Sequence, residues 1–211
     1  MTMIVIIDYG MGNLRSVSKA LESLGASVKV SSDPQEIRRA EKMVLPGVGA
    51  FTAAMQELSA RGLIEPLKRV LISGIPYLGI CLGLQLLFEW SEEGGGAKGL
   101  GILSGTVNRL TVSPPLKIPH IGWNQVMRSQ KSEVRGQKEC PLLRGIPDGS
   151  FVYFVHSYYA KPSDRSVVAL ETDYETRFAS MVWRDQLYAT QFHPEKSQAV
   201  GLKLLKNFID L

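Results

Sequence analysis

The chain has 211 residues, 45% of them hydrophobic, which is enough material for one large domain with a sizeable core. Its 24 Lys and Arg residues outnumber the 20 Asp and Glu residues, but they are scattered, which excludes the clustered basic footprint of a nucleic-acid-binding domain. We therefore expect a single domain over residues 1–211 whose net charge of +4 is a solvated surface.

Cysteine content and apolar segments exclude further classes. Cys81 and Cys140 are the only cysteines, so no disulfide framework is indicated, and the N-terminus lacks a basic leader. Residues 70–88 carry no charge and approach the length of a membrane span, but several glycines, Pro76 and Gln85 interrupt them. We expect a cytoplasmic protein. The cysteines and histidines show no metal-ligand spacing, so we expect no metal and no cofactor.

The first half of the chain alternates strand and helix patterns. Continuous apolar runs predict buried strands, and apolar residues at helical spacing predict helices between them. The expected strands cover residues 3–8, 27–30 and 42–45, and the expected helices cover residues 14–24, 33–37, 52–60 and 63–72. This alternation predicts a doubly wound, mostly parallel sheet flanked by helices, with functional groups at the carboxyl ends of its strands.

Residues 75–90, IPYLGICLGLQLLFEW, then predict a short strand, a tight turn and an amphipathic helix that begins at or just after Cys81. The G-x-C-x-G pattern has the form of a nucleophile elbow, in which small flanking residues let the backbone bend sharply. A helix N-terminus beside the sulfur would stabilise the thiolate, which is the reactive form. Cys81 is therefore the candidate nucleophile, whereas Cys140 is expected to be a small buried hydrophobe.

The second half has a different pattern. Residues 92–101, EEGGGAKGLG, predict a flexible surface loop. Short strand patterns without long helices follow at residues 106–110, 124–128, 151–155, 167–172, 178–184 and 187–192. A closing helix is predicted over residues 197–211. The predicted fold class is therefore α/β, with an additional, mostly antiparallel strand region in the C-terminal half.

Among the three histidines, His193 has the sequence context of a catalytic base. In an extended segment, His193 and Glu195 project to the same side because strand side chains alternate. A carboxylate that accepts from one ring nitrogen leaves the other nitrogen free to take a thiol proton. Cys81, His193 and Glu195 are therefore candidates for nucleophile, base and orienting group. His120 and His156 keep the default interpretation of structural histidines.

Acyl transfer also needs hydrogen-bond donors for the oxyanion of its tetrahedral intermediate. The backbone N–H groups of the Gly47-Val48-Gly49 loop, and that of Leu82 just after the nucleophile, are candidates. The two glycines would let this loop approach closely or change its orientation. An ordinary tight turn is the alternative, and the residues alone leave it open.

These motifs resemble those of one enzyme family. The class I, triad-type glutamine amidotransferases carry similar motifs to P-G-V-G, G-I-C-L-G-L-Q and H-P-E, found here at residues 46–49, 79–85 and 193–195. Three longer blocks resemble the branch of this family that serves histidine biosynthesis more than the branches for anthranilate or pyridoxal phosphate; they lie at residues 8–17, 119–124 and 154–159.

The resemblance implies a glutaminase in which Cys81 attacks the side-chain amide of glutamine, His193 shuttles protons and Glu195 orients His193. It implies an oxyanion hole at or beside Gly47, Val48 and Leu82, substrate contacts at Gly49, Gln85, His156, Ser157 and Tyr158, and a partner interface at Asn13, Arg15, His120, Trp123 and Asn124.

The resemblance also implies a partner, a cyclase subunit with a (β/α)8 barrel that forms a heterodimer and receives ammonia through a tunnel. The residues agree, because no phosphate-binding loop or basic cluster here could hold a phosphorylated acceptor. If the oxyanion donors align only when the partner holds its ligand, glutamine hydrolysis in this chain is coupled to ligand binding in the partner. Two alternatives stay open: a stand-alone thiol hydrolase acting on peptides or esters, and a non-catalytic binding protein, against which the complete triad argues.

Overall fold

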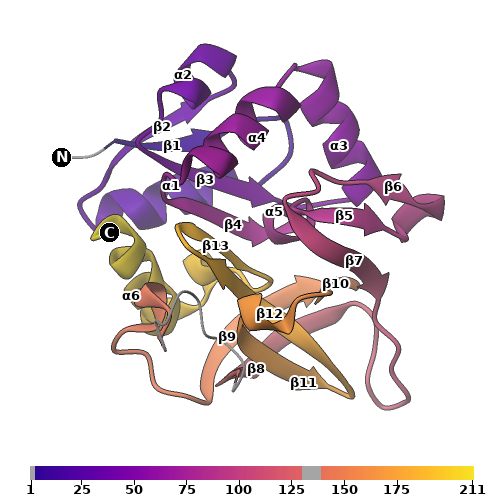
Figure 1. Ribbon diagram of the computed structural model, residues 1–211. Helices are drawn as coiled ribbons and strands as arrows, with labels where there is room; N and C mark the ends of the chain where they lie inside the picture. Colours follow the sequence, from indigo (N-terminus) through magenta and orange to yellow (C-terminus); the bar gives the residue numbers. More distant parts are fainter. Residues whose placement is uncertain (1–2, 130–138) are drawn as a thin grey trace.

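The computed structural model describes residues 3–129 and 139–211, which form a central sheet with helices on both faces (Figure 1). The strands are β1 (Met3–Ile7), β2 (Ser27–Ser31), β3 (Lys42–Gly47), β4 (Tyr77–Cys81), β5 (Phe88–Ser91), β6 (Ala97–Lys98), β7 (Leu103–Arg109), β8 (His120–Arg128), β9 (Ser150–His156), β10 (Tyr158–Pro162), β11 (Val168–Tyr174), β12 (Thr176–Arg184) and β13 (Leu187–Thr190). The α-helices are α1 (Leu14–Ser23), α2 (Pro34–Arg38), α3 (Phe51–Ala60), α4 (Ile64–Ser73), α5 (Leu82–Gln85) and α6 (Gln198–Ile209). Short 3₁₀ helices are η1 (Glu93–Gly95), η2 (Pro141–Leu143), η3 (Arg165–Val167) and η4 (Pro194–Lys196).

The order of the strands confirms the predicted fold class. Within the described residues, the central sheet has the order β2-β1-β3-β4-β13-β12-β11-β8-β9. The strands from β2 to β13 pair in parallel, and those from β13 to β9 pair antiparallel. β13 joins the two parts, because it runs parallel to β4 and antiparallel to β12.

Helices cover both faces of the parallel strands, which explains the continuous apolar sequences of these strands. Every residue of β3 and β4 is buried. On one face, the core includes Phe51 of α3 and Leu67 of α4. On the other face, it includes Val17 of α1 and Phe208 of α6. The two layers of side chains hold the carboxyl ends of β3 and β4 side by side.

The helix predicted after Cys81 is wrong in its length. α5 ends at Gln85, and the chain then enters β5, which pairs with β7 in a second sheet of order β10-β7-β5-β6. Residues 81–88 are all buried, so a helix here has no solvent-facing side of the kind that the spacing predicted. The carbonyl of Leu86 accepts the N–H of Leu100 and so bonds to a distant segment instead of continuing a helix.

Residues 92–101 have more regular structure than the flexible loop predicted for them. They contain η1 and β6, and β6 pairs antiparallel with β5. The Glu93 carboxylate accepts the backbone N–H of Phe51 at 2.8 Å and thereby caps the start of α3. β10, which is absent from the predicted strands, pairs with β7. The Glu93 contact and the β7–β10 pairing join segments that lie far apart in the chain, whereas β5 and β6 are close in sequence.

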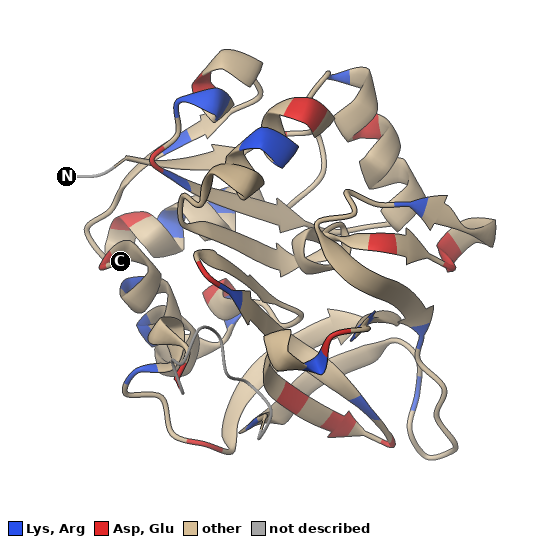
Figure 2. Ribbon diagram, in the orientation of Figure 1, with Lys and Arg blue, Asp and Glu red and all other residues tan. Residues whose placement is uncertain are grey.

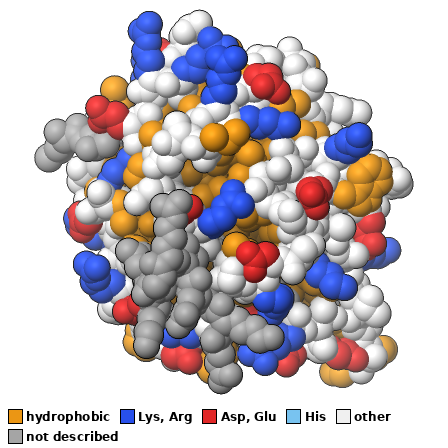
Figure 3. All heavy atoms as spheres, in the orientation of Figure 1, with side chains coloured by type: hydrophobic (Ala, Val, Ile, Leu, Met, Phe, Trp, Pro, Cys, Tyr) orange, Lys and Arg blue, Asp and Glu red, His pale blue; other side chains and the backbone are white. Residues whose placement is uncertain are grey.

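Charged residues are scattered over the helices and strands, as expected (Figure 2). The face seen in Figure 3 mixes both signs of charge around hydrophobic side chains near its centre. No helix in the described ranges is long and apolar enough to cross a membrane. In the same ranges, no three His, Cys, Asp or Glu side chains come together as a metal site. A single domain over residues 1–211 stays a prediction.

Candidate active site

Cys81 lies at the carboxyl end of β4, where the backbone turns into α5. Its φ of 55° and ψ of −107° are rare for a residue with a side chain and mark a strained elbow. A Cβ atom on Gly79 would lie 2.7 Å from the Gly83 oxygen. A Cβ atom on Gly83 would lie 2.0 Å from the Leu45 oxygen. Close backbone contacts therefore require both glycines of the G-x-C-x-G pattern, as a nucleophile elbow predicts.

The surroundings of the Cys81 sulfur differ in one respect from the prediction. α5 is only four residues long, so the predicted support from a helix dipole is largely missing. The sulfur instead lies 3.9 Å from the Val155 carbonyl oxygen and 3.7 Å from Nε2 of Gln191. Cys81 is 7% exposed, and its remaining accessible surface faces a cavity.

His193 and Glu195 form a buried pair beside this cavity. Nδ1 of His193 lies 2.8 Å from Oε1 of Glu195, and both side chains are almost fully buried. The segment is not extended, the condition under which the two side chains were expected to share one side, because Glu195 lies in η4. Pro194 begins that turn, which suits its fixed φ and missing N–H. The two side chains still meet, as predicted.

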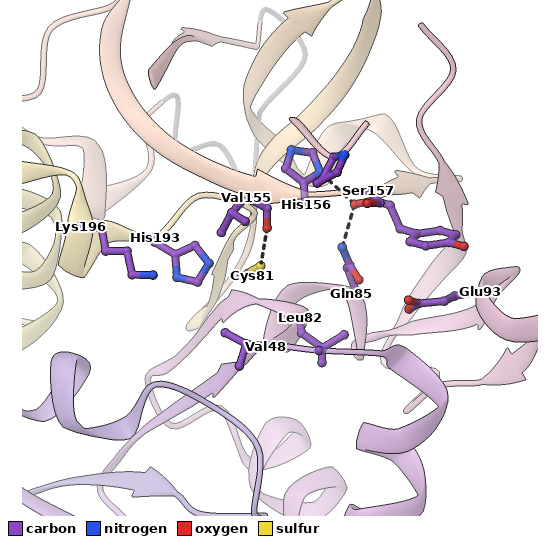
Figure 4. Close-up of a pocket in the computed structure, with 13 residues that line it drawn as sticks. Val48, Cys81, Leu82, Gln85, Glu93, Val155, His156, Ser157, His193 and Lys196 are labelled. Atoms are coloured by element: carbon purple, nitrogen blue, oxygen red, sulfur yellow. Dashed lines mark hydrogen bonds between the residues drawn. The ribbon is translucent and has the colours of Figure 1, made fainter. Parts of the chain in front are cut away.

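The His193 ring lies beside Cys81 (Figure 4). Its Nε2 atom is buried and interacts with the Cys81 sulfur without forming a well-aligned hydrogen bond. Burial alone would lower the pKa of His193, but Cys81 and Glu195 together outweigh burial and raise this pKa to about 10. The ring is therefore cationic at neutral pH and places a positive charge next to the sulfur.

A cavity of about 440 Å³ brings the candidate residues together. From the predicted set, it is lined by Val48, Gly49, Cys81, Leu82, Gln85, His156, Ser157, Tyr158 and His193. It is also lined by four residues that were not predicted, Glu93, Pro119, Val155 and Lys196. Lys196 directly follows the H-P-E motif, which could have identified it. Pro119 and Val155 lie in the blocks at residues 119–124 and 154–159. Glu93 carries no such signal, because η1 brings it to the cavity.

Gly47 lies opposite Cys81, at the adjacent ends of β3 and β4. A Cβ atom on Gly47 would lie 2.5 Å from the Tyr9 hydroxyl, so a larger residue would displace the buried tyrosine. Gly49 has a φ of 98°, in the left-handed region that favours glycine. The Gly47 contact restricts this loop to a residue without a side chain, whereas a left-handed glycine such as Gly49 also fits an ordinary tight turn. The oxyanion role of Gly47, Val48 and Leu82 stays a prediction.

Gln85 and His156 converge on one backbone oxygen. Nε2 of Gln85 donates to the Tyr158 carbonyl at 2.8 Å and to Oε1 of Gln191 at 3.1 Å. Nδ1 of His156 lies 2.9 Å from the same carbonyl oxygen and must carry a proton, since a carbonyl only accepts. Burial lowers the pKa of His156 to about 3, so the ring is neutral. Gln191 is a site residue that sequence reasoning missed.

The predicted partner residues of β8 lie on two different faces of the strand. Trp123 is 45% exposed, but His120 is only 3% exposed. The His120 ring stacks on Tyr174 at a centroid distance of 3.9 Å, and its Nδ1 lies 3.1 Å from Nε2 of His156. Because strand side chains alternate, His120 and Asn124 point away from the face that carries Trp123. The His120 side chain therefore packs inside this chain, and its role at an interface stays a prediction.

Asn13 and Arg15 lie at the start of α1. Oδ1 of Asn13 accepts the N–H of Ser16 at 3.4 Å and caps the helix. Arg15 is exposed and accessible to another protein. The role of both residues at an interface stays a prediction.

Comparisons with known proteins agree with this geometry. Residues 5–211 match the family model of class-I glutamine amidotransferases. The imidazole glycerol phosphate synthase subunit HisH of Syntrophotalea carbinolica is 53% identical over 99% of this chain and 100% of the relative. The protein of the same name from Aquifex aeolicus is 54% identical over 97% of this chain and 94% of the relative.

Solved structures support the fold. A crystal structure of a glutamine amidotransferase matches with a TM-score of 0.72 at 17% identity, over 98% of this chain and 97% of that one. The structure of PurLQS from Thermotoga maritima matches with a TM-score of 0.71 at 16% identity, over 99% of this chain and 98% of that one. The chain therefore belongs to the class-I glutamine amidotransferases and, within them, to the family of imidazole glycerol phosphate synthase HisH subunits.

Proposed function

We propose that this chain is the glutaminase subunit of an imidazole glycerol phosphate synthase and hydrolyses glutamine to glutamate and ammonia for histidine biosynthesis. The buried group of Cys81, His193 and Glu195 beside a cavity large enough for an amino acid carries the proposal. Relatives that share about half of its sequence over their full length bear the name of that enzyme's HisH subunit.

The chemistry follows from the three side chains. The Cys81 thiolate attacks the side-chain amide carbon of glutamine, and the amide oxygen takes up the negative charge. His193 gives its Nε2 proton to the amide nitrogen, the carbon–nitrogen bond breaks, and ammonia leaves a thioester on Cys81. His193 then takes a proton from a water molecule as that water attacks the thioester. The carbon–sulfur bond breaks and glutamate leaves, while Glu195 holds the imidazole in place throughout.

The cavity wall supplies the remaining contacts in this proposal. Backbone N–H groups of Val48 and Leu82 would hold the oxyanion, and Gly49, Gln85 and the backbone of residues 156–158 would hold substrate glutamine. Their shared position around one cavity supports these roles. If the oxyanion donors align only when a partner holds its ligand, the isolated chain should hydrolyse glutamine slowly.

An exposed apolar surface supports a protein partner. Four large hydrophobic side chains lie on one side of the β8–β9 pair and are exposed: Ile121, Trp123, Met127 and Phe151. A group of this kind on one face of a sheet is typical of a protein interface. We assign this surface to a cyclase subunit with a (β/α)8 barrel, which forms a heterodimer with this chain in the cytoplasm and receives its ammonia.

Labelling with diazo-oxo-norleucine, an electrophilic analogue of glutamine, tests the function. We expect one adduct, on Cys81, faster in the presence of a cyclase partner and its ligand. Cys81→Ala should give neither an adduct nor glutamine hydrolysis, while the control Cys140→Ala should keep both. Absence of an adduct with and without the cyclase would contradict the proposal. Hydrolysis of peptides or esters but not glutamine would favour a stand-alone thiol hydrolase.

A further inference from the structure

We propose that Gln191 is a further catalytic residue, whose side-chain amide donates a hydrogen bond to the Cys81 sulfur and stabilises the thiolate. This role rests on the glutaminase function proposed above. Nε2 of Gln191 lies 3.7 Å from Sγ of Cys81, and the Gln191 side chain is fully buried. Water therefore does not compete for this donor, and the low dielectric around it strengthens the interaction.

The orientation of the Gln191 amide follows from its neighbours. The Tyr158 carbonyl can only accept, so Gln85 must turn Nε2 toward it, at 2.8 Å. The same Nε2 lies 3.1 Å from the end of the Gln191 side chain. Two donors would repel at this distance, so the atom of Gln191 that faces Gln85 is the acceptor Oε1. The Nε2 group of Gln191 is thereby left to face Cys81.

The donor is held in place by the central sheet. Gln191 directly follows β13, and its backbone N–H donates to the Ser180 carbonyl of β12 at 2.9 Å. Its backbone is therefore fixed on the element that pairs with β4, which carries Cys81. A donor fixed before the reaction begins needs no rearrangement when negative charge forms on the sulfur.

The other groups around the sulfur explain why such a donor matters. In the thiol form, S–H can donate to the Val155 carbonyl oxygen at 3.9 Å. After ionisation, that oxygen faces a negative charge and opposes it. His193 supplies positive charge, but its Nε2 atom does not form a well-aligned hydrogen bond with the sulfur. The short α5 contributes little helix dipole, so the Gln191 N–H is the hydrogen-bond donor that faces the ionised sulfur.

The rate of Cys81 alkylation by iodoacetamide, measured against pH and read by peptide mass, tests the proposal. Gln191→Met keeps a similar side-chain length but cannot donate. We expect the midpoint of its pH–rate profile to rise by about one pH unit, so that alkylation near neutral pH slows about tenfold. Gln191→Glu turns an acceptor toward the sulfur while still accepting from Gln85, so its midpoint should rise further.

Two controls separate a direct effect from a general disturbance. Thr190→Val removes a buried hydrogen bond to the Phe192 carbonyl, without touching the sulfur, and should leave the midpoint unchanged. Cys140 in the same chain reports unfolding, because it is buried and should be alkylated only if the fold opens. A Gln191 variant in which Cys140 stays unlabelled is still folded, so the midpoint of its pH–rate profile tests the role of Gln191.

An unchanged midpoint in such a folded variant overturns the role of Gln191. A native chain that diazo-oxo-norleucine does not label, with or without cyclase, would instead overturn the glutaminase function. The native chain could be labelled and active while the pH–rate profiles of the Gln191 variants stay unchanged. That result would leave the glutaminase function standing and remove only the role of Gln191.

Discussion

The regions around Cys81 and Cys140 share a local architecture but differ in their chemistry. Both cysteines are buried, and each directly precedes a short helix, α5 or η2. Burial raises the pKa of Cys140 to about 12, even though two backbone N–H groups of η2 and the nearby Arg128 charge act in the opposite direction. Cys81 instead faces the cationic ring of His193 and the amide of Gln191.

The comparison shows what a nucleophile needs beyond a helix start. Backbone donors and the nearby Arg128 charge together do not overcome burial at Cys140. The two cysteines also differ in their backbone, since Cys140 has an ordinary φ of −61° and Cys81 has a strained φ of 55°. The imidazole–carboxylate pair of His193 and Glu195 and a strained elbow therefore distinguish the reactive thiol from the structural one. Single substitutions can remove the charge behind His193 and disturb the elbow separately.

Removing the charge behind His193 should have the largest effect. In Glu195→Gln, the side chain keeps its shape but no longer stabilises the imidazolium or fixes its tautomer. We expect kcat for glutamine hydrolysis to fall about 10³-fold or more. Steady-state glutaminase assays with a cyclase partner and its ligand measure this, with the exposed Glu57→Gln as the matched control. A loss below tenfold would argue against the orienting role of Glu195.

The surroundings of His193 should also make stability depend on pH. Cys81 and Glu195 together raise the pKa of His193 from its ordinary value of 6.5 to about 10 in the folded chain, so the stabilisation that they give is complete below pH 6.5 and is lost as the pH rises through 10. Glu195→Gln removes only the Glu195 part and leaves a buried histidine without its carboxylate, so the native chain should exceed this variant in free energy of unfolding by about 3 kcal/mol near pH 6. Urea unfolding at several pH values should show this difference shrinking towards pH 10; a constant difference would contradict the assignment.

Disturbing the elbow should have a smaller effect on stability. The added methyl group in Gly83→Ala would lie 2.0 Å from the Leu45 backbone oxygen, which neither α5 nor β3 can easily accommodate. We expect a loss of about 2 kcal/mol in the free energy of unfolding, together with slower labelling of Cys81. Gly25→Ala is the control, because that glycine has a left-handed φ of 87° with no atom nearby. Equal behaviour of both variants in Cys81 labelling would show that the elbow tolerates side chains.

Much of the parallel half could be predicted because its signals are local. β3 and β4 are continuous apolar runs buried on both faces, and helical spacing marks α1, α3 and α4. The contact between His193 and Glu195 also needs only two residues of separation, so it forms although the segment turns into η4 and is not extended. The G-x-C-x-G pattern predicts the elbow for the same local reason.

Only the tertiary structure decided the remaining features, because these depend on partners distant in sequence. Burial on every side and bonds to residues 100–103 end α5 early, and strand alternation on β8 turns His120 inward. The surroundings of the sulfur were decided in the same way. Cys81 and the H-P-E motif are visible in the sequence, but the aim of the Gln191 amide depends on Tyr158 and Gln85 meeting it across the fold.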